Sequence, residues 1–157
     1  MLNAETLSSG RLGVAYGSTS GSSGELEKFS TPLMIDRSMR GLESNAYLRI
    51  MSHTCAANLA NHFRVRGRVV PTCSACTSGS QAIGVGYELI RQGVQDVMVC
   101  GGAEEMHYTT AVTFDLLMAT STHYNDAPQR SPRPFDARRD GLVVGEGAGT
   151  VVLEELE

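Results

Sequence analysis

The sequence has no tryptophan, only four cysteines and five prolines, and no apolar run near the ~20 residues that cross a bilayer. It opens on MLNAETLSSG, which has neither the charged nor the apolar segment of a secretory signal. Four cysteines set within apolar patterns are too few for a disulfide framework at this length. These absences predict a cytoplasmic protein with reduced thiols and no membrane partner.

An excess of positive charge is also lacking, because 13 basic and 17 acidic residues give a formal net charge of −4. This balance gives no broad attraction to nucleic acid or to an anionic membrane. With 41% hydrophobic residues the chain lies in the globular range, and its 157 residues suit one domain with one core.

Apolar runs and helical periodicities alternate along the chain. Strands are expected at 11–16, 68–75 and 97–100, helices at 45–63 and 77–91, a long loop at 123–139, and a pair of strands at 142–144 and 150–153. Strands that alternate with helices predict an α/β fold.

Both predicted helices carry an apolar stripe. In the first, the stripe recurs every four positions: Tyr47, Met51, Cys55, Leu59 and Phe63. In the second, the shared face is Ile83, Tyr87 and Ile90. Three glycines inside the second helix, Gly79, Gly84 and Gly86, each cost about 1 kcal/mol relative to alanine, so a close neighbour is expected along this helix.

Two predicted strands differ in their expected surroundings. Proline has no N–H, so Pro71 predicts that its strand lies at an edge or an interface. The run Val97 to Cys100 is continuously apolar, which is typical of a strand buried on both faces, and Cys100 is therefore expected in the core.

Cys76 lies where a predicted strand gives way to a helix, within Ser74-Ala75-Cys76-Thr77-Ser78-Gly79. The N–H groups and dipole of a helix N-terminus favour a thiolate and can hold an oxyanion, and small neighbours admit a substrate. The pattern has the form of a nucleophile elbow. A cysteine simply buried at a helix start fits the spacing equally well.

Other patterns support weaker alternatives. Cys73-x-x-Cys76 matches a redox or half-zinc motif, although no second pair has finger-like spacing. The glycine-serine loop at 17–24 invites phosphate but lacks a P-loop ending, so a flexible loop is favoured. Glu104 and Glu105 are expected to be solvated or ion-paired, and the scattered histidines are not expected to be ligands.

Three ordered segments are distinctive: PTCSACTSGSQAIG around Cys76, DVMVCGGAEEM from Asp96, and SPRPFDARRDGLVVGEGAGTVVLEELE from Ser131. Together they resemble the β-ketoacyl-acyl-carrier-protein synthases, the type I/II condensing enzymes of the thiolase superfamily. The resemblance covers nearly the whole chain. It implies a thiolase-like α/β fold with a mixed sheet, of which residues 1–157 correspond to the nucleophile-bearing N-terminal half.

The resemblance also implies roles for residues. The cysteine matching Cys76 receives an acyl chain from acyl carrier protein as a thioester, and malonyl carrier protein is then decarboxylated to supply the attacking carbanion. Pocket-lining positions of the family fall at Ser20 and Ala111, and its acyl-pocket phenylalanine falls at Phe114.

Partners follow from the same resemblance. Arg37 and Arg40 resemble basic positions that dock the acidic carrier protein, although two solvated arginines fit equally well. The strand at 68–75 resembles the family's dimerisation strand, which predicts a homodimer. No cofactor and no metal are implied.

The family's later motifs, of HGTST, GH and GFGGTN type, do not occur in these residues. The sequence therefore resembles an internal slice of a synthase. Besides an acyltransferase with Cys76 as nucleophile, two alternatives remain: a non-catalytic truncated or split partner subunit of a ketosynthase, and a small thiol redox module.

Overall fold

A computed structural model describes residues 4–156, which form two compact units. The first contains the chain up to Glu104 together with the residues from Gly147 on, and the second is Glu105–Glu146. The helices are α1 Ala4–Ser8, α2 Ser23–Met34, α3 Tyr47–Ile50, α4 Thr54–His62, α5 Ser78–Arg91 and α6 Tyr108–Leu116, with a short 3-10 helix at Pro128–Arg130. The strands are β1 Leu12–Gly17, β2 Val69–Thr72, β3 Val97–Glu104 and β4 Gly147–Glu154.

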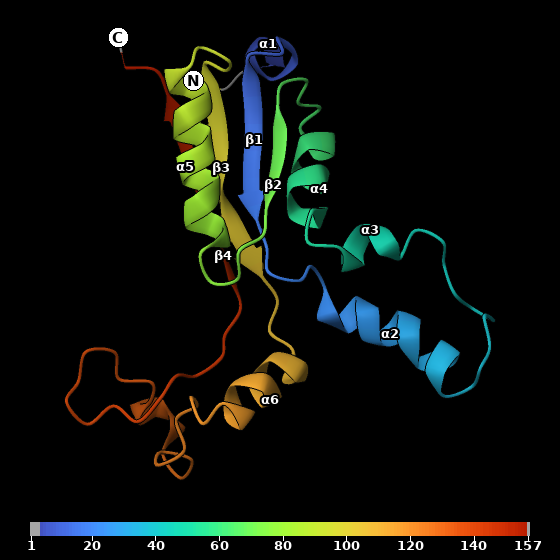
Figure 1. The fold of residues 1–157 in the computed structure, drawn as a ribbon, viewed down its shortest axis with the longest axis vertical. Coiled ribbons are helices and arrows are strands. Elements are labelled where there is room, and N and C mark those ends of the chain that lie inside the picture. Colours follow the sequence, from blue (N-terminus) through green and yellow to red (C-terminus); the bar gives the residue numbers. More distant parts are fainter. Residues whose placement is uncertain (1–3, 157) are drawn as a thin grey trace. The chain divides into compact units, whose positions relative to one another are not determined.

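The strands of the first unit form one mixed sheet in the order β2-β1-β3-β4 (Figure 1). β1 runs parallel to both β2 and β3, and β4 runs antiparallel to β3. Helices connect the parallel strands, as crossover connections require. The predicted α/β fold with a mixed sheet is confirmed.

Helices cover both faces of the sheet, α4 on one side and α5 on the other (Figure 1). On the α4 side, Val14 and Tyr16 pack with Ala56. On the α5 side, Met98 and Cys100 belong to the second cluster, with Ala82 of the helix. All six residues of β1 are buried because the strand is covered on both faces, and the predicted burial of Cys100 is confirmed.

The single helix expected at 45–63 is wrong, because the chain breaks between α3 and α4. Cys55 and Leu59 of the expected stripe do pack against the core. Tyr47, Met51 and Phe63 are instead about half exposed. Their places in the core are taken by the alanines of α4, whose short side chains let the helix lie close to the sheet.

The apolar face predicted for the second helix is only partly buried. Ile90 packs against the core, but Ile83 and Tyr87 are 38% and 57% exposed. The buried face consists of small residues one turn apart: Ser78, Ala82 and Gly86.

The expected close neighbour of this helix is found at Gly86, where an added Cβ would collide with Cys100 Sγ. Gly79 faces Gly102. A Cβ added to Gly102 would lie 3.1 Å from the Cα of Gly79. At Gly84 nothing lies within 4 Å, so the close approach does not explain that glycine.

Pro71 lies in the edge strand β2, as expected. The carbonyls of Arg68 and Thr72 accept hydrogen bonds from Val14 and Ser18, respectively, so these positions face β1. Because backbone groups alternate in direction along a strand, Pro71 faces away from β1, where its missing N–H leaves no gap in the sheet.

Of the two strands expected near the C-terminal end, the one at 150–153 is confirmed within β4 and the one at 142–144 is wrong. Only β4 is a strand, and Leu142 makes an isolated bridge to Thr120. The neighbouring loop of the second unit is organised instead by Asp140, which accepts hydrogen bonds from Ser121 Oγ at 2.7 Å and from the backbone N–H of His123 at 2.8 Å. These bonds, the one from His123 foremost, hold the pKa of Asp140 below its ordinary value.

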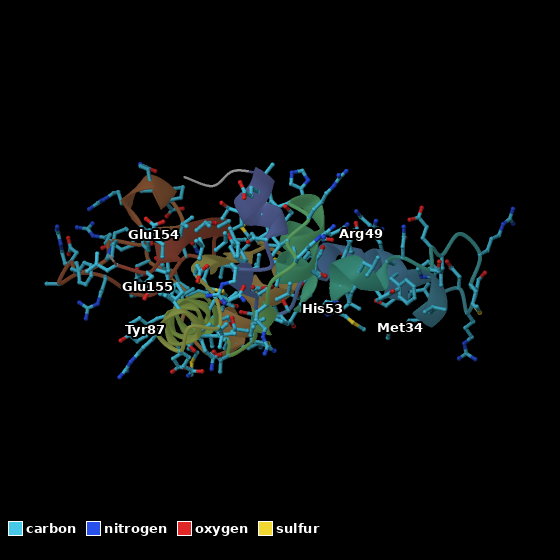
Figure 2. The ribbon with its side chains drawn as sticks, turned by 90° about the horizontal axis from the view of Figure 1, so that it is seen from above. Met34, Arg49, His53, Tyr87, Glu154 and Glu155 are labelled. Carbon is cyan, nitrogen blue, oxygen red and sulfur yellow. The ribbon has the colours of Figure 1, made fainter. Side chains whose placement is uncertain are left out.

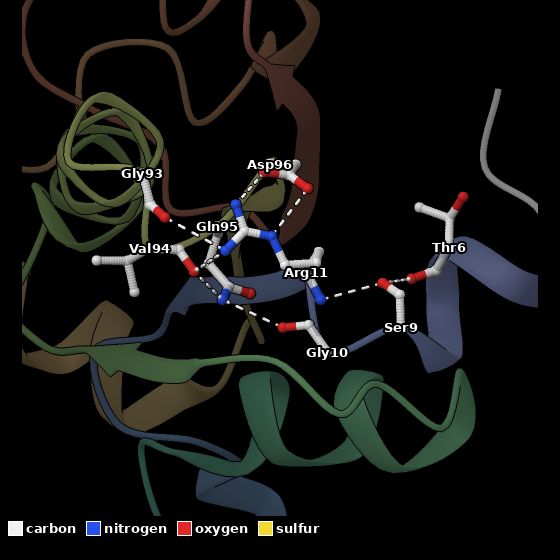
Figure 3. Close-up of polar contacts among 8 residues, drawn as sticks. All are labelled: Thr6, Ser9, Gly10, Arg11, Gly93, Val94, Gln95 and Asp96. Carbon is white, nitrogen blue, oxygen red and sulfur yellow. Dashed lines mark hydrogen bonds and ion pairs between the residues drawn. The ribbon is translucent and has the colours of Figure 1, made fainter.

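The amino ends of the parallel strands are joined by polar side chains (Figure 3). Arg11 donates to Asp96 at 2.9 Å and to the carbonyl of Gly93 at 3.3 Å. Gln95 is only 5% exposed, and its side-chain amide donates to the carbonyl of Gly10 at 3.3 Å. Side chains thus tie the start of β1 to the segment between α5 and β3.

Within residues 4–156, no helix is both long and apolar enough to cross a membrane.

Candidate active site

Cys76 lies in the turn between β2 and α5 and is exposed. Ala75, directly before it, has a φ of 50°, in the left-handed region that alanine rarely adopts. Such local strain persists only where surrounding contacts hold it. The structure therefore places Cys76 on a tight turn at the start of a helix, as a nucleophile elbow requires.

Ser78 supplies many of the contacts that hold this turn. Its hydroxyl donates to the carbonyl of Ala75 at 2.7 Å and accepts from the N–H of Ser74 at 2.9 Å. Its carbonyl accepts from Thr72 Oγ1 at 2.8 Å. The sequence did not predict this role, although a serine at the second position of the predicted helix 77–91 was an available signal.

The start of α5 also offers free donors. The backbone N–H groups of Gly79 and Ser80 have no hydrogen-bond partner among residues 4–156. The first N–H groups of a helix lack intrahelical acceptors and carry its positive dipole end. They can stabilise a negative charge that develops beside the helix.

A cavity of about 530 Å³ lies at the carboxyl ends of β1 and β3. Cys76 and Gly79 line it from the α5 side, and Ser18, Thr19 and Glu104 line it from the strand ends. Its remaining wall includes backbone of glycine residues: Gly17, Gly101, Gly102, Gly147 and Gly149. Glycine leaves room for a substrate to approach the cysteine.

Glu104, the last residue of β3, is bound to the loop after β1. Its carboxylate accepts hydrogen bonds from Ser18 Oγ at 2.8 Å and from the N–H of Thr19. These donors belong to the glycine-serine loop considered for phosphate, so a carboxylate already occupies them. Glu104 is exposed, as expected for a solvated carboxylate, and it also anchors this loop beside the cavity.

The four thiols differ in exposure. Cys73 and Cys76 are exposed, Cys55 is half-buried and Cys100 is buried. Burial, reinforced by the charge of Glu104, raises the pKa of Cys55. Burial also raises the pKa of Cys100 to about 11. A thiol with a raised pKa is a poor nucleophile at neutral pH, so the two exposed cysteines are the chemically available ones.

The other predicted site residues are more scattered. Ser20 is exposed in the turn after β1 and does not line the cavity beside Cys76. Ala111 and Phe114 are half-buried on α6, three positions apart, and belong to the second unit. Arg37 and Arg40 are exposed in the segment after α2, and neither forms an ion pair with a residue in the range 4–156.

No histidine lines the cavity that contains Cys76. His107 caps α6 by accepting from the N–H of Thr109, and His123 lies 3.7 Å from Asp140. In the part of the chain that the structure describes, no group of three or more His, Cys, Asp or Glu residues could hold a metal ion.

Residues 1–157 match the family model described as "Beta-ketoacyl synthase, N-terminal domain". The chain is 35% identical over 156 residues to 3-oxoacyl-[acyl-carrier-protein] synthase 1 of Haemophilus influenzae, covering 99% of this chain and 38% of that protein. It is 39% identical over 150 residues to the synthase 1 of Escherichia coli K12, covering 94% of this chain and 36% of that protein. The chain thus spans well under half the length of these curated relatives.

Solved structures share the fold. A β-ketoacyl synthase from Burkholderia phymatum STM815 is 54% identical with a TM-score of 0.90, and the match covers 99% of this chain and 38% of that one. A type II polyketide-synthase ketosynthase in complex with its acyl carrier protein is 25% identical with a TM-score of 0.88, covering 98% of this chain and 39% of that one.

Proposed function

Because the chain belongs to the β-ketoacyl synthase family, through that family's N-terminal domain, we propose that it is the nucleophile-bearing part of a 3-oxoacyl-[acyl-carrier-protein] synthase of fatty-acid biosynthesis. The observation that carries this proposal is the position of Cys76: exposed, on a strained turn at the start of α5, and lining the cavity.

This geometry supports a mechanism for the first half of the reaction. The Cys76 thiolate attacks the carbonyl carbon of an acyl thioester, and the negative charge that develops on the oxygen needs preorganised donors. The N–H of Gly79 has no partner among residues 4–156, and Gly79 lines the same cavity as Cys76, so this N–H is the candidate donor. The carrier thiol then leaves with a proton, and the acyl chain remains on Cys76.

This transfer is tested by incubating the protein with an acyl thioester and locating the adduct by mass spectrometry. The acyl mass is expected on the peptide that contains Cys76, and to be lost in Cys76→Ala. Cys55→Ala is the matched control and should be acylated like the wild type, because Cys55 is half-buried with a raised pKa. An adduct on Cys55 instead would overturn the assignment.

The second half of the reaction requires groups that residues 1–157 do not contain. Decarboxylation of a malonyl thioester places negative charge on an enolate oxygen, which preorganised donors must stabilise. In the family that this chain resembles, the donors are two histidines of the later HGTST- and GH-type motifs. No histidine lines this cavity. We therefore expect residues 1–157 alone to accept an acyl group without condensing it. Ketoacyl product above the uncatalysed rate, lost in Cys76→Ala, would refute this.

We propose acyl carrier protein as the donor partner and the exposed Arg37 and Arg40 as its docking residues. The carrier-protein complex of a structurally similar ketosynthase supports the partner. Reversing charge in Arg37→Glu/Arg40→Glu should slow acylation from the carrier protein about tenfold and leave acylation from a small acyl-pantetheine thioester unchanged. Equal slowing of both donors would contradict docking.

We also propose a homodimer formed through β2. Among the described residues, β2 pairs only with β1, and the backbone groups of Val69 and Pro71 face away from β1. Since proline offers no donor, Val69 supplies the outward N–H within this strand. Sedimentation should give a dimer that Val69→Pro dissociates and Val69→Ala retains. A wild-type monomer at micromolar concentration would exclude it.

A further inference from the structure

One exposed thiol is left unused by the proposed acyl transfer. Cys73 directly follows the last residue of β2, and its thiol donates to the carbonyl of Thr19 at 3.3 Å. Thr19 also lines the cavity that contains Cys76. Thr19 therefore contacts Cys73 and lines the same cavity as Cys76.

The chain between the two cysteines turns back on itself. The N–H of Thr77 donates to the carbonyl of Ser74 at 3.2 Å, which closes a four-residue turn around the left-handed Ala75. Below the turn, the bond from Thr72 to Ser78 joins the end of β2 to the start of α5. Cys73 and Cys76 thus lie in one small loop that is closed at its base.

The remaining thiols cannot compete with this pair. Cys55 is half-buried and Cys100 is buried in the sheet, and burial raises the pKa of both. Redox-sensitive cysteines are accessible, and they commonly have a second cysteine close by that can resolve the oxidised form. Cys73 and Cys76 are both exposed and lie three residues apart in one closed loop, so they are the pair that fits this pattern.

We propose that Cys73 and Cys76 form a hydroperoxide-responsive thiol pair. The Cys76 thiolate attacks the peroxide O–O bond, giving Cys76 sulfenic acid and one hydroxide ion, which takes a proton to become water. The Cys73 sulfur then attacks the sulfenic sulfur, forming the disulfide and releasing a second water. Peroxide is reduced and the two thiols are oxidised. A dithiol reduces the disulfide back to the two thiols by thiol–disulfide exchange. The disulfide blocks acylation of Cys76 reversibly.

The sequence makes the test direct, because tryptic cleavage after Arg68 and Arg91 leaves both cysteines in one peptide, 69–91. The purified protein is treated with hydrogen peroxide, alkylated and digested with trypsin, and the peptide masses are measured by mass spectrometry. The expected product is peptide 69–91 lighter than the reduced form by two hydrogens, carrying no alkyl group. A dithiol should restore double alkylation. Acylation of Cys76 should fall at least about tenfold on oxidation and recover on reduction.

Cys73→Ser is the informative variant, with Cys55→Ser as its matched control. In Cys73→Ser, peroxide should leave Cys76 as a sulfenic acid that a cyclic 1,3-diketone traps, or as sulfinic acid that a dithiol does not reverse. Cys55→Ser should form the disulfide like the wild type. A disulfide between two protein molecules, or sulfinic Cys76 in the wild type without the internal disulfide, would overturn the proposal. These readouts are masses of one peptide, so they stand or fall independently of the proposed condensing activity.

Discussion

The two ends of the parallel strands are built differently. At the amino ends, Arg11, Gln95 and Asp96 bridge neighbouring segments with side-chain hydrogen bonds (Figure 3). At the carboxyl ends, Gly17 and Gly102 have no side chains and line a cavity. Ligands of open α/β sheets bind outside the carboxyl ends of the strands. One end of this sheet is bridged by polar contacts, and the other end holds the cavity that Cys76 lines.

A second contrast concerns the outer surface of the first unit. Figure 2 labels Tyr87 on the outward side of α5 and Met34 at the end of α2, and these side chains are 57% and 76% exposed. The amphipathic elements therefore carry apolar side chains outside the two clusters of buried residues. Apolarity alone does not identify the core of this chain.

The largest expected effect compares the exposed thiol of Cys76 with the fully buried thiol of Cys100 in β3. Cys76 should alkylate more than about a hundredfold faster than Cys100, whose pKa is about 11 and whose thiolate is scarce at neutral pH. Timed alkylation with peptide mapping measures the ratio. Labelling of Cys55 or Cys100 as fast as Cys76 in the folded protein would remove the contrast.

The next effect tests whether the glycines of the cavity end are required. An added Cβ at Gly17 would lie 2.5 Å from backbone atoms of Ser78, so Gly17→Ala should destabilise the protein by about 3 kcal/mol. Gly149→Ala is the matched control, because it lines the same cavity with nothing within 4 Å. Urea denaturation compares the two variants. Equal stability would mean that the close approach of α5 is unimportant.

A smaller loss is expected at the amino ends. Gln95→Leu removes the partner of the Gly10 carbonyl and of the Arg68 N–H, and should cost about 2 kcal/mol. The rate of Cys76 alkylation should not change, because Gln95 lies at the other end of the strands. Gln81→Leu, at an exposed position of α5, is the control. A slowed Cys76 in Gln95→Leu would show that the two ends are coupled.

The smallest effect is expected at the ion pair between Arg11 and Asp96, which is about half exposed. The hydrogen bond and charge of Arg11 lower the pKa of Asp96 below its ordinary value of 3.8. The stability from this pair is therefore present above that value and is lost as the pH falls through the lowered pKa. Asp96→Asn should differ from the wild type at neutral pH and converge with it in acid. Added salt should shrink the difference, and a difference that persists in acid would contradict the mechanism.

Several elements could be predicted because their signals are local. Continuous apolarity marks β3, and the missing N–H of Pro71 marks β2 as an edge strand. Helix α2 was missed although its signal was present: Ser22 caps it by accepting from the N–H of Glu25 at 3.1 Å, the spacing of a capping box.

Other features could not be predicted, because they depend on distances between elements. The buried face of α5 consists of Ala82 and Gly86 because the helix lies too close to β3 for larger side chains, which leaves Ile83 exposed. Periodicity reports where apolar residues lie on a helix but not how near the sheet will be. The expected strand at 142–144 failed for a similar reason, since its backbone found partners at Ala119 and Ser121 instead.

The sequence by itself determined the family resemblance and the position of Cys76, because small residues around a cysteine between a strand and a helix are a local pattern. Only the tertiary structure decided that Glu104 anchors Ser18 and Thr19 beside the cavity, and that Cys73 reaches the same loop. These residues lie far apart in the chain. They meet because parallel strands joined by helices bring their carboxyl ends to one edge of the sheet.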